Sequence, residues 1–254
     1  MKPTSAITAL PRARGRDSEA SRSAILAAAL AEFAEHGLAG ARMDTIAATA
    51  GVNKALLYYY FRSKDELYAA VLDEFFQRLQ ERIGRALGTD TSAGERVLLY
   101  ARAHFDSVAE SRHYARLFQG EMSVGREDSP HLSHIVERYI RPISIRVLEV
   151  LRQGIGTGEF RGVDPAQFAP TMAATIVSYF VSPVVRRLRG VDPYAPQSIQ
   201  QRRAAVLDFI AAALFVNRNA GLKLAAEVAG RPIGQDGSSE TATAARSRAR
   251  GRRK

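Results

Sequence analysis

The chain of 254 residues contains no cysteine. It therefore forms no disulfide, binds no metal through a thiolate and has no cysteine nucleophile, and redox sensing through thiols is excluded. It also lacks an uncharged apolar run near the roughly 18 to 20 residues that span a bilayer. The N-terminal segment has no continuous apolar stretch of the secretory-signal kind, since Thr8, Pro11 and three arginines interrupt it. We expect a soluble, cytoplasmic protein.

Motifs of common enzymes are missing as well. The sequence has no G-x-S-x-G, no H-E-x-x-H and no phosphate-binding loop, and its carboxylates are scattered as on solvated helix faces. The glycines between Gly154 and Arg161 follow no predicted strand and precede no G-K-[ST], so they predict a helix stop and a turn. His131 and His134 stand three apart without a third ligand. We predict no enzyme, no cofactor and no metal site.

Positive charge is concentrated at the two ends of the chain. The formal net charge is +10. Residues 1–22 carry five basic and two acidic side chains, and residues 231–254 carry seven and two, which leaves a net charge of only +2 between them. Both ends lack apolar periodicity, which predicts disorder. The charge indicates an anionic partner, but most of it lies outside the expected folded part.

Helices are predicted throughout the remaining chain. Apolar residues recur at intervals of three and four from Ser21 onward, and no segment alternates as a strand does, so the predicted fold class is all-α. Capping boxes are expected where Ser63 precedes Glu66 and where Ser92 precedes Glu95. The expected helices cover approximately residues 21–37, 43–50, 54–62, 64–87, 93–110, 112–122, 130–155, 165–189, 198–218 and 222–229, with kinks at Pro142 and Pro183.

The first three expected helices have the lengths of a helix-turn-helix, with a tight corner at Gly51. The segment 31–67 contains the patterns F-x-x-x-G (Phe33, Gly37), I-A-x-x-A-G-V (Ile46, Ala47, Ala50, Gly51, Val52), L-Y-x-x-F (Leu57, Tyr58, Phe61) and S-K-x-x-L (Ser63, Lys64, Leu67). With these patterns the segment resembles the TetR family of transcriptional regulators without a gap. Two positions differ from the family: Arg42 replaces the usual Ser or Thr cap, and Leu56 a small polar residue.

The third helix carries the expected DNA-reading face. With Leu57 pointing to the core, Ala55 and Tyr59 fall near the opposite side of the helix. Lys54 lies at the helix start, where base edges and phosphates are within reach, and the resemblance implies a phosphate contact for Lys64. The predicted DNA-binding residues are Arg42, Asn53, Lys54, Ala55, Leu56, Tyr58, Tyr59, Tyr60 and Lys64. The alternative for the three tyrosines is a set of partly buried rings that pack this helix onto the first.

The basic ends have two interpretations each. Arg12, Arg14 and Arg16 precede the first helix and either reach into the adjacent minor groove or form a solvated leader. The C-terminal segment either attracts DNA without sequence preference or has no role in binding.

The resemblance also implies a dimer and a ligand pocket. A single helix-turn-helix contacts few base pairs, so we expect a homodimer held by the last two long helices, with an interface of Met172, Ile176, Phe180, Leu207, Ile210 and Leu214. Many of these side chains would also be core in a monomer, so the pattern supports burial more firmly than it supports dimerisation. Polar groups on otherwise apolar stripes are expected to line a small-molecule pocket. They are Tyr100, His104, His113, Tyr114, Gln119, His134, Tyr139, Ser178 and Tyr179.

The predicted organisation is a disordered basic arm (1–20), a helix-turn-helix domain (21–67), a helical dimerisation and ligand-sensing domain (68–229) and a disordered basic tail (230–254). The predicted function is that of a sequence-specific transcriptional regulator, a repressor released from a palindromic operator on double-stranded DNA by a small-molecule ligand. The alternative is a nucleoid-type or ligand-independent DNA-binding protein without strong sequence preference.

Overall fold

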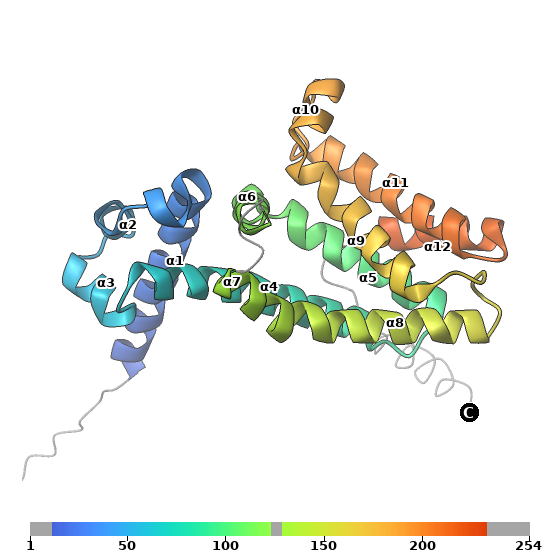
Figure 1. The fold of residues 1–254 in the computed structure, drawn as a ribbon, viewed down its shortest axis with the longest axis horizontal. Coiled ribbons are helices and arrows are strands. Elements are labelled where there is room, and N and C mark those ends of the chain that lie inside the picture. Colours follow the sequence, from blue (N-terminus) through green and yellow to red (C-terminus); the bar gives the residue numbers. More distant parts are fainter. Residues whose placement is uncertain (1–11, 123–128, 233–254) are drawn as a thin grey trace, which may run out of the picture.

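The computed structural model describes residues 12–122 and 129–232. It confirms the all-α prediction, because every regular element in these two ranges is a helix (Figure 1). The elements are α1 (Arg12–Gly40), α2 (Met43–Thr49), α3 (Lys54–Tyr60), α4 (Lys64–Leu87), α5 (Ala93–Ala109), α6 (Arg112–Glu121), α7 (Pro130–Ile135), the π-helical η1 (Val136–Ile140), α8 (Arg141–Gly156), α9 (Pro165–Val181), α10 (Pro183–Arg189), α11 (Pro196–Leu214) and α12 (Arg218–Gly230). No helix in the described ranges combines the length and apolar character that crossing a bilayer demands.

Helices α1 to α3 form a small unit at one end of the molecule, called the head below (Figure 1). Its core joins Phe33 of α1, Ile46 of α2 and Leu57 of α3, all essentially inaccessible to water. The corner after α2 is made by Gly51, whose φ of 68° lies in the left-handed region that favours glycine. This corner fixes the angle between α2 and α3.

Helix α4 leaves the head and runs into the rest of the molecule (Figure 1). The Ser63 hydroxyl caps its start by accepting the backbone N–H of Glu66 at 3.0 Å. The Glu66 carboxylate does not return to Ser63, as a reciprocal capping box requires, and accepts instead the backbone N–H of Arg62 at 3.0 Å. The charge of Glu66 in the first turn also suits the helix dipole.

Helix α5 is the centre of the body, the name used below for α5 to α12. It packs against α4, α6, α8, α9, α11 and α12. It is therefore buried on nearly all sides, which explains why its inward positions are apolar or small and why the few polar ones need partners.

One buried charge, Arg102 on α5, holds the C-terminal helix in place. Its guanidinium donates to the backbone carbonyls of Val228 at 2.8 Å and Arg231 at 2.6 Å, at the end of α12. The Asp106 carboxylate lies 3.4 Å from Arg102 and 2.6 Å from Arg203 of α11. Burial raises the pKa of Asp106, against the effect of the two arginines. This network ties α11 and α12 to α5.

The glycine-containing segment after α8 makes a turn at the end of the body. Gly154 lies beneath the Phe160 ring, and a Cβ added there would come within 2.1 Å of that ring. Beyond the turn, the backbone N–H of Arg161 donates to Leu214 at 2.8 Å, and Phe160 pairs with Phe215 across an isolated bridge. The geometry is that of a structural turn between two helices.

Several helix bounds differ from the prediction, each for a local reason. The expected helix 130–155 is divided by η1, since the Pro142 ring would clash with the carbonyl of Arg138 in a regular helix. The expected helix 165–189 is broken at Ser182, which is extended before Pro183. The expected helix 198–218 runs instead from Pro196 to Leu214, because Phe215 is extended.

The basic arm also differs from the prediction in its last part. Residues 12–20, expected to be disordered, are the first turns of α1. Residues 1–11 of the predicted arm and residues 233–254 of the predicted tail lie outside the described part of the chain, so their interpretations stay predictions.

Candidate nucleic-acid interface

Helix α3 presents two tyrosines to the surface of the head. Leu57 is inaccessible and Phe61 nearly so, whereas Tyr59 is 79% exposed and Tyr58 41% exposed. Tyr60 is half-buried, and the edges and faces of the Tyr59 and Tyr60 rings meet at a centroid distance of 5.5 Å. Tyr59 is therefore too exposed to serve as a packing residue, while Tyr60 fits the alternative reading of a partly buried ring.

The start of α3 is fixed by its cap. The Asn53 side chain accepts the backbone N–H of Leu56 at 2.7 Å, so its amide oxygen is occupied in this conformation. Ala55 is exposed and Leu56 is half-buried. The exposed face of the helix thus consists of Ala55 and Tyr59, flanked by Tyr58, in agreement with the helical geometry.

An ion pair lies on this surface. The Lys54 ammonium is 2.7 Å from the Asp44 carboxylate of α2, and both side chains are more than half exposed. Their hydrogen bond lowers the pKa of Asp44 and raises that of Lys54. Asp44 therefore neutralises the one cation that α3 carries.

We expect Asp44→Asn to strengthen DNA binding. The substitution removes a carboxylate that repels phosphate and frees Lys54 to bind it, so affinity at about 0.1 M salt rises by about 3- to 10-fold, and the salt dependence steepens by about one counterion per half-site. The measurement is a fluorescence-anisotropy titration at several salt concentrations. Glu149→Gln, an equal charge change on the exposed face of α8, is the matched control and leaves both quantities unchanged.

Three other predicted contacts are engaged within the head. The backbone N–H of Arg42 donates to Glu32 of α1 at 2.9 Å, while the start of α2 has no side-chain cap. The Tyr60 hydroxyl donates to the Ser18 carbonyl at 3.0 Å. The Lys64 ammonium donates to the carbonyls of Ala39 at 3.0 Å and Ala41 at 3.3 Å, at the end of α1.

These bonds give the three residues a structural role in the free protein. Tyr60 connects α3 to the first turns of α1, and Lys64 connects α4 to the last turn of α1. A third ammonium proton of Lys64 is left for a phosphate, so a DNA contact is compatible with this geometry.

The prediction that six side chains form the dimer interface is corrected by their burial. All six are buried within the chain's own core, with exposed fractions of 3% or less: Met172, Ile176, Phe180, Leu207, Ile210 and Leu214. The apolar stripes of α9 and α11 face α5, which accounts for their burial without a second protomer. These six side chains are therefore not available to a second protomer.

The nine predicted ligand residues do not line one cavity. Tyr100, Tyr114, Tyr139 and Tyr179 are buried, His104 and His113 half-buried, and Gln119, His134 and Ser178 exposed. They belong to separate groups: the Tyr100 hydroxyl lies 3.4 Å from His104 within α5, whereas His134 and Tyr139 both lie 2.8 Å from Asp73 of α4. Burial lowers the pKa of His104 to about 4, which keeps its ring neutral near pH 7.

Two of the predicted ligand residues line hollows on the surface. Tyr114 lines a groove of about 390 Å³ along α4, where the Arg78 guanidinium donates to its hydroxyl at 2.9 Å. Gln119 lines a smaller cavity between α6 and the end of α9, together with Arg112 and Arg116. The two arginines were missed in the sequence, although their spacing of four on one short helix places them on one face.

The two histidines considered as metal ligands bind carboxylates. His131 Nε2 is 3.0 Å from Asp65, and His134 Nε2 is 2.8 Å from Asp73. Among the residues that the structure describes, no three His, Cys, Asp or Glu side chains are grouped as a metal site.

Known proteins share this head and this fold. The profile of the bacterial regulatory proteins of the tetR family matches residues 25–71. The HTH-type transcriptional repressor SCO4008 of Streptomyces coelicolor is 39% identical over 131 residues, which are 51% of this chain and 64% of that protein. The HTH-type transcriptional activator FasR of Mycolicibacterium smegmatis is 38% identical over 101 residues, 39% of this chain and 46% of that protein.

Both sequence matches span less than two thirds of the relative's own length. The likeness in fold extends further. The structure of the ketosteroid transcriptional regulator KstR2 of Mycobacterium tuberculosis superposes with a TM-score of 0.58 at 23% identity, and the superposition covers 82% of this chain and 93% of that one.

A short helix with exposed tyrosines, held behind a glycine corner on two supporting helices, defines a helix-turn-helix head of the kind that enters a DNA groove. Residues 25–71 match the model of the bacterial regulatory proteins of the tetR family, and the described chain is similar in fold to a solved transcriptional regulator.

Proposed function

We propose that the chain is a homodimeric transcriptional repressor that reads a palindromic operator with α3 of each protomer and leaves it when a small molecule binds the body. The observation that carries the proposal is the exposed face of α3, where Ala55, Tyr58 and Tyr59 stand open to solvent on a rigid three-helix head. The name of the repressor from Streptomyces coelicolor supports repression.

The exposed face suits base reading in the major groove. The methyl group of Ala55 and the rings of Tyr58 and Tyr59 offer apolar contacts to thymine methyl groups, and the two hydroxyls can donate to phosphate or accept from bases. Lys54 supplies charge once it leaves Asp44. Tyr60 positions the neighbouring ring of Tyr59 and does not itself read bases.

A dimer is supported by the outer faces of α9 and α11. Helix α9 contains no charged residue in its 17 positions, although Pro170, Thr171, Ala174 and Ser178 are exposed. An uncharged exposed face is unusual for a surface helix and typical of a buried interface core. On α11, Phe209 is 55% exposed and would be covered by a partner.

We further propose that each predicted segment of the chain has its own function. Residues 21–67 read DNA, residues 68–229 pair with the partner and sense the ligand, and residues 1–20 and 230–254 add positive charge. The boundary near residue 67 falls inside the first turn of α4, so the two functional parts share one continuous helix.

In vitro selection of DNA bound by the full chain tests this function. We expect an enriched inverted repeat whose half-sites are centred about one helical turn, roughly 34 to 36 Å, or a multiple of it apart. The selected sequence should bind at least about 1,000-fold more tightly than a scrambled duplex at physiological salt. A pool without an enriched motif, or a preference of only a few-fold, would instead identify a nucleoid-type protein.

A further inference from the structure

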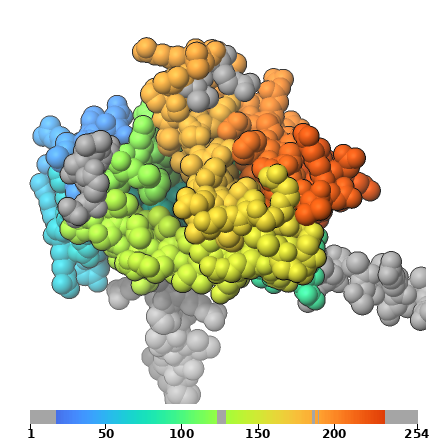
Figure 2. Space-filling model, turned by 45° about the vertical axis from the view of Figure 1, so that its right-hand side comes forward, coloured from blue at the N-terminus to red at the C-terminus, as the bar shows by residue number. Residues whose placement is uncertain are grey.

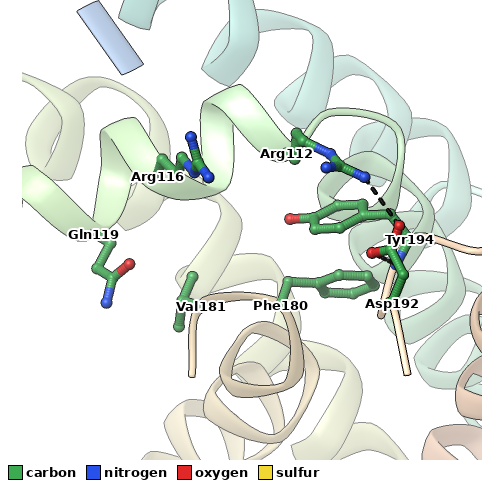
Figure 3. Close-up of a pocket in the computed structure, with 7 residues that line it drawn as sticks. All are labelled: Arg112, Arg116, Gln119, Phe180, Val181, Asp192 and Tyr194. Carbon is green, nitrogen blue, oxygen red and sulfur yellow. Dashed lines mark hydrogen bonds and ion pairs between the residues drawn. The ribbon is translucent and has the colours of Figure 1, made fainter. Parts of the chain in front are cut away.

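The cavity between α6 and the end of α9 has an unusual lining for its size (Figure 3). Its volume is about 40 Å³. Helix α6 supplies Arg112 and Arg116 on one side, the last turn of α9 supplies Phe180 and Val181 on the opposite side, and Asp192 and Tyr194 come from the segment before α11. Two arginines therefore face an aromatic surface across a space that admits a group of only a few atoms.

The two arginines differ in how they are held. Arg112 lies 3.1 Å from the Asp192 carboxylate, and its guanidinium stands 5.0 Å from the centroid of the Tyr194 ring. Arg116 is exposed and forms no ion pair with any residue in the described ranges. The charge of Arg112 is thus balanced by a carboxylate, and the charge of Arg116 is not.

The aromatic side of the cavity is packed against the core of the body. The rings of Phe180 and Tyr194 lie 5.2 Å apart, and Phe180 itself is buried against Phe105 of α5 at 5.2 Å. Figure 3 shows the Tyr194 hydroxyl directed toward the middle of the cavity, below α6 and above Phe180. The two rings and Val181 offer an apolar surface to whatever is attached to a bound anion.

The Arg112–Asp192 pair can be opened at little cost. Both side chains are about half exposed, and exposed ion pairs contribute little to stability. An incoming anion that binds Arg116 would also attract Arg112, in competition with Asp192. A bidentate guanidinium contact favours a carboxylate or phosphate over a neutral polar group of the same size.

We propose that this cavity binds the anionic head, a carboxylate or phosphate, of a small molecule with an apolar body. Arg116 is the principal contact, Arg112 turns from Asp192 to the anion, and the body of the molecule lies along Phe180 and Val181. The binding event itself needs no DNA, but its regulatory consequence rests on the proposed function. Helix α6 packs against α1 of the head as well as against α9. A group inserted beside α6 therefore contacts a helix that supports the head.

The test uses octanoate, octyl phosphate and the neutral octanamide as probes, with the full chain and without DNA, by isothermal titration calorimetry. We expect at least one of the two anions to bind at least about 10-fold more tightly than octanamide, and Arg116→Gln to weaken that anion by at least about 10-fold. We expect Asp192→Asn to strengthen it by about 3- to 10-fold, because Arg112 then has no competing carboxylate. The two anions differ only in the head, so their ratio identifies which one the site prefers.

Arg152→Gln, an exposed arginine on α8, is the matched control and should bind the anions as the unchanged chain does. Equal binding of octanoate, octyl phosphate and octanamide, no effect of Arg116→Gln, or no binding of either anion up to about 5 mM would each overturn the inference. Far-UV circular dichroism of each variant shows that a loss of binding is not a loss of folding.

A second arm separates this inference from the proposed function. The bound anion is added to the complex of the chain with its selected DNA, and release is followed by anisotropy. Tight selective DNA binding without anion binding leaves the proposed function in place and removes the inference. Anion binding that depends on Arg116, in a chain that shows no DNA sequence preference, leaves the inference in place and removes the proposed function.

Discussion

Tyr59→Ala is expected to lower the affinity for the selected operator by at least about 30-fold. Tyr59 is the more exposed of the two surface tyrosines of α3, and its ring contacts that of Tyr60 edge to face. A direct contact to a base contributes about 1 to 3 kcal/mol, and a dimer loses it in both half-sites. The measurement is a titration of the labelled operator followed by anisotropy, with a scrambled duplex beside it.

Two further variants define what the ring does. Tyr59→Phe keeps the apolar contact and removes the hydroxyl, so a loss confined to Tyr59→Ala indicates contact with a thymine methyl, whereas an equal loss in both indicates a hydrogen bond. Val216→Ala, at a comparably exposed apolar side chain of the body, is the control. Unchanged operator affinity in Tyr59→Ala would show that α3 is not the reading helix.

Phe209→Glu is expected to dissociate the dimer. If the outer faces of α9 and α11 pair across a two-fold axis, Phe209 becomes buried and a glutamate in its place brings two desolvated carboxylates to the interface. We expect the dimer dissociation constant to rise by at least about 100-fold and the operator affinity to fall with it. Analytical ultracentrifugation across a range of concentrations measures the first quantity.

Ile145→Glu provides the comparison for this variant. Ile145 on α8 is 51% exposed, so the substitution makes the same chemical change at a similar exposure on another helix. It should leave the oligomeric state as it is. A dimer that survives Phe209→Glu, or one that is lost equally in Ile145→Glu, would place the pairing surface elsewhere.

The head was predictable from the sequence because its signals are local. Gly51 marks a corner through its own backbone conformation, and Asn53 and Ser63 cap helices that begin within three residues of them. The exposure of Tyr59 follows from the 100° step of the helix once Leu57 points inward. None of these inferences needs a contact with a distant part of the chain.

Burial in the body was predictable, but its cause was not. The stripes that include Met172 and Leu207 were expected to be buried, either by a partner or in the core of one chain, and the structure shows that α5 of the same chain covers them. Periodicity indicates that a face is buried and does not say by what. The absence of charge along α9 was the available signal for the outer face, since a solvated face ordinarily carries some.

The cavity beside α6 could not be assembled from the sequence. Arg112 and Arg116 are neighbours on one helix, but Asp192 and Tyr194 lie about 80 positions away and reach them only because α9 packs against α6 and breaks at Ser182. The predicted ligand residues were chosen for polarity on apolar stripes, a property that buried tyrosines with local partners share. A binding site formed by residues so far apart in the sequence is recognised only in the three-dimensional structure.

The continuity of α4 makes the molecule mechanically sensitive. Its 24 residues span about 36 Å, and Lys64 fastens its first turn to the end of α1. A tilt of about 5° at the far end of such a lever displaces the head by about 3 Å. Successive bases along one strand of DNA are about 3.4 Å apart, so a tilt of this size would move α3 along the DNA by almost one base pair.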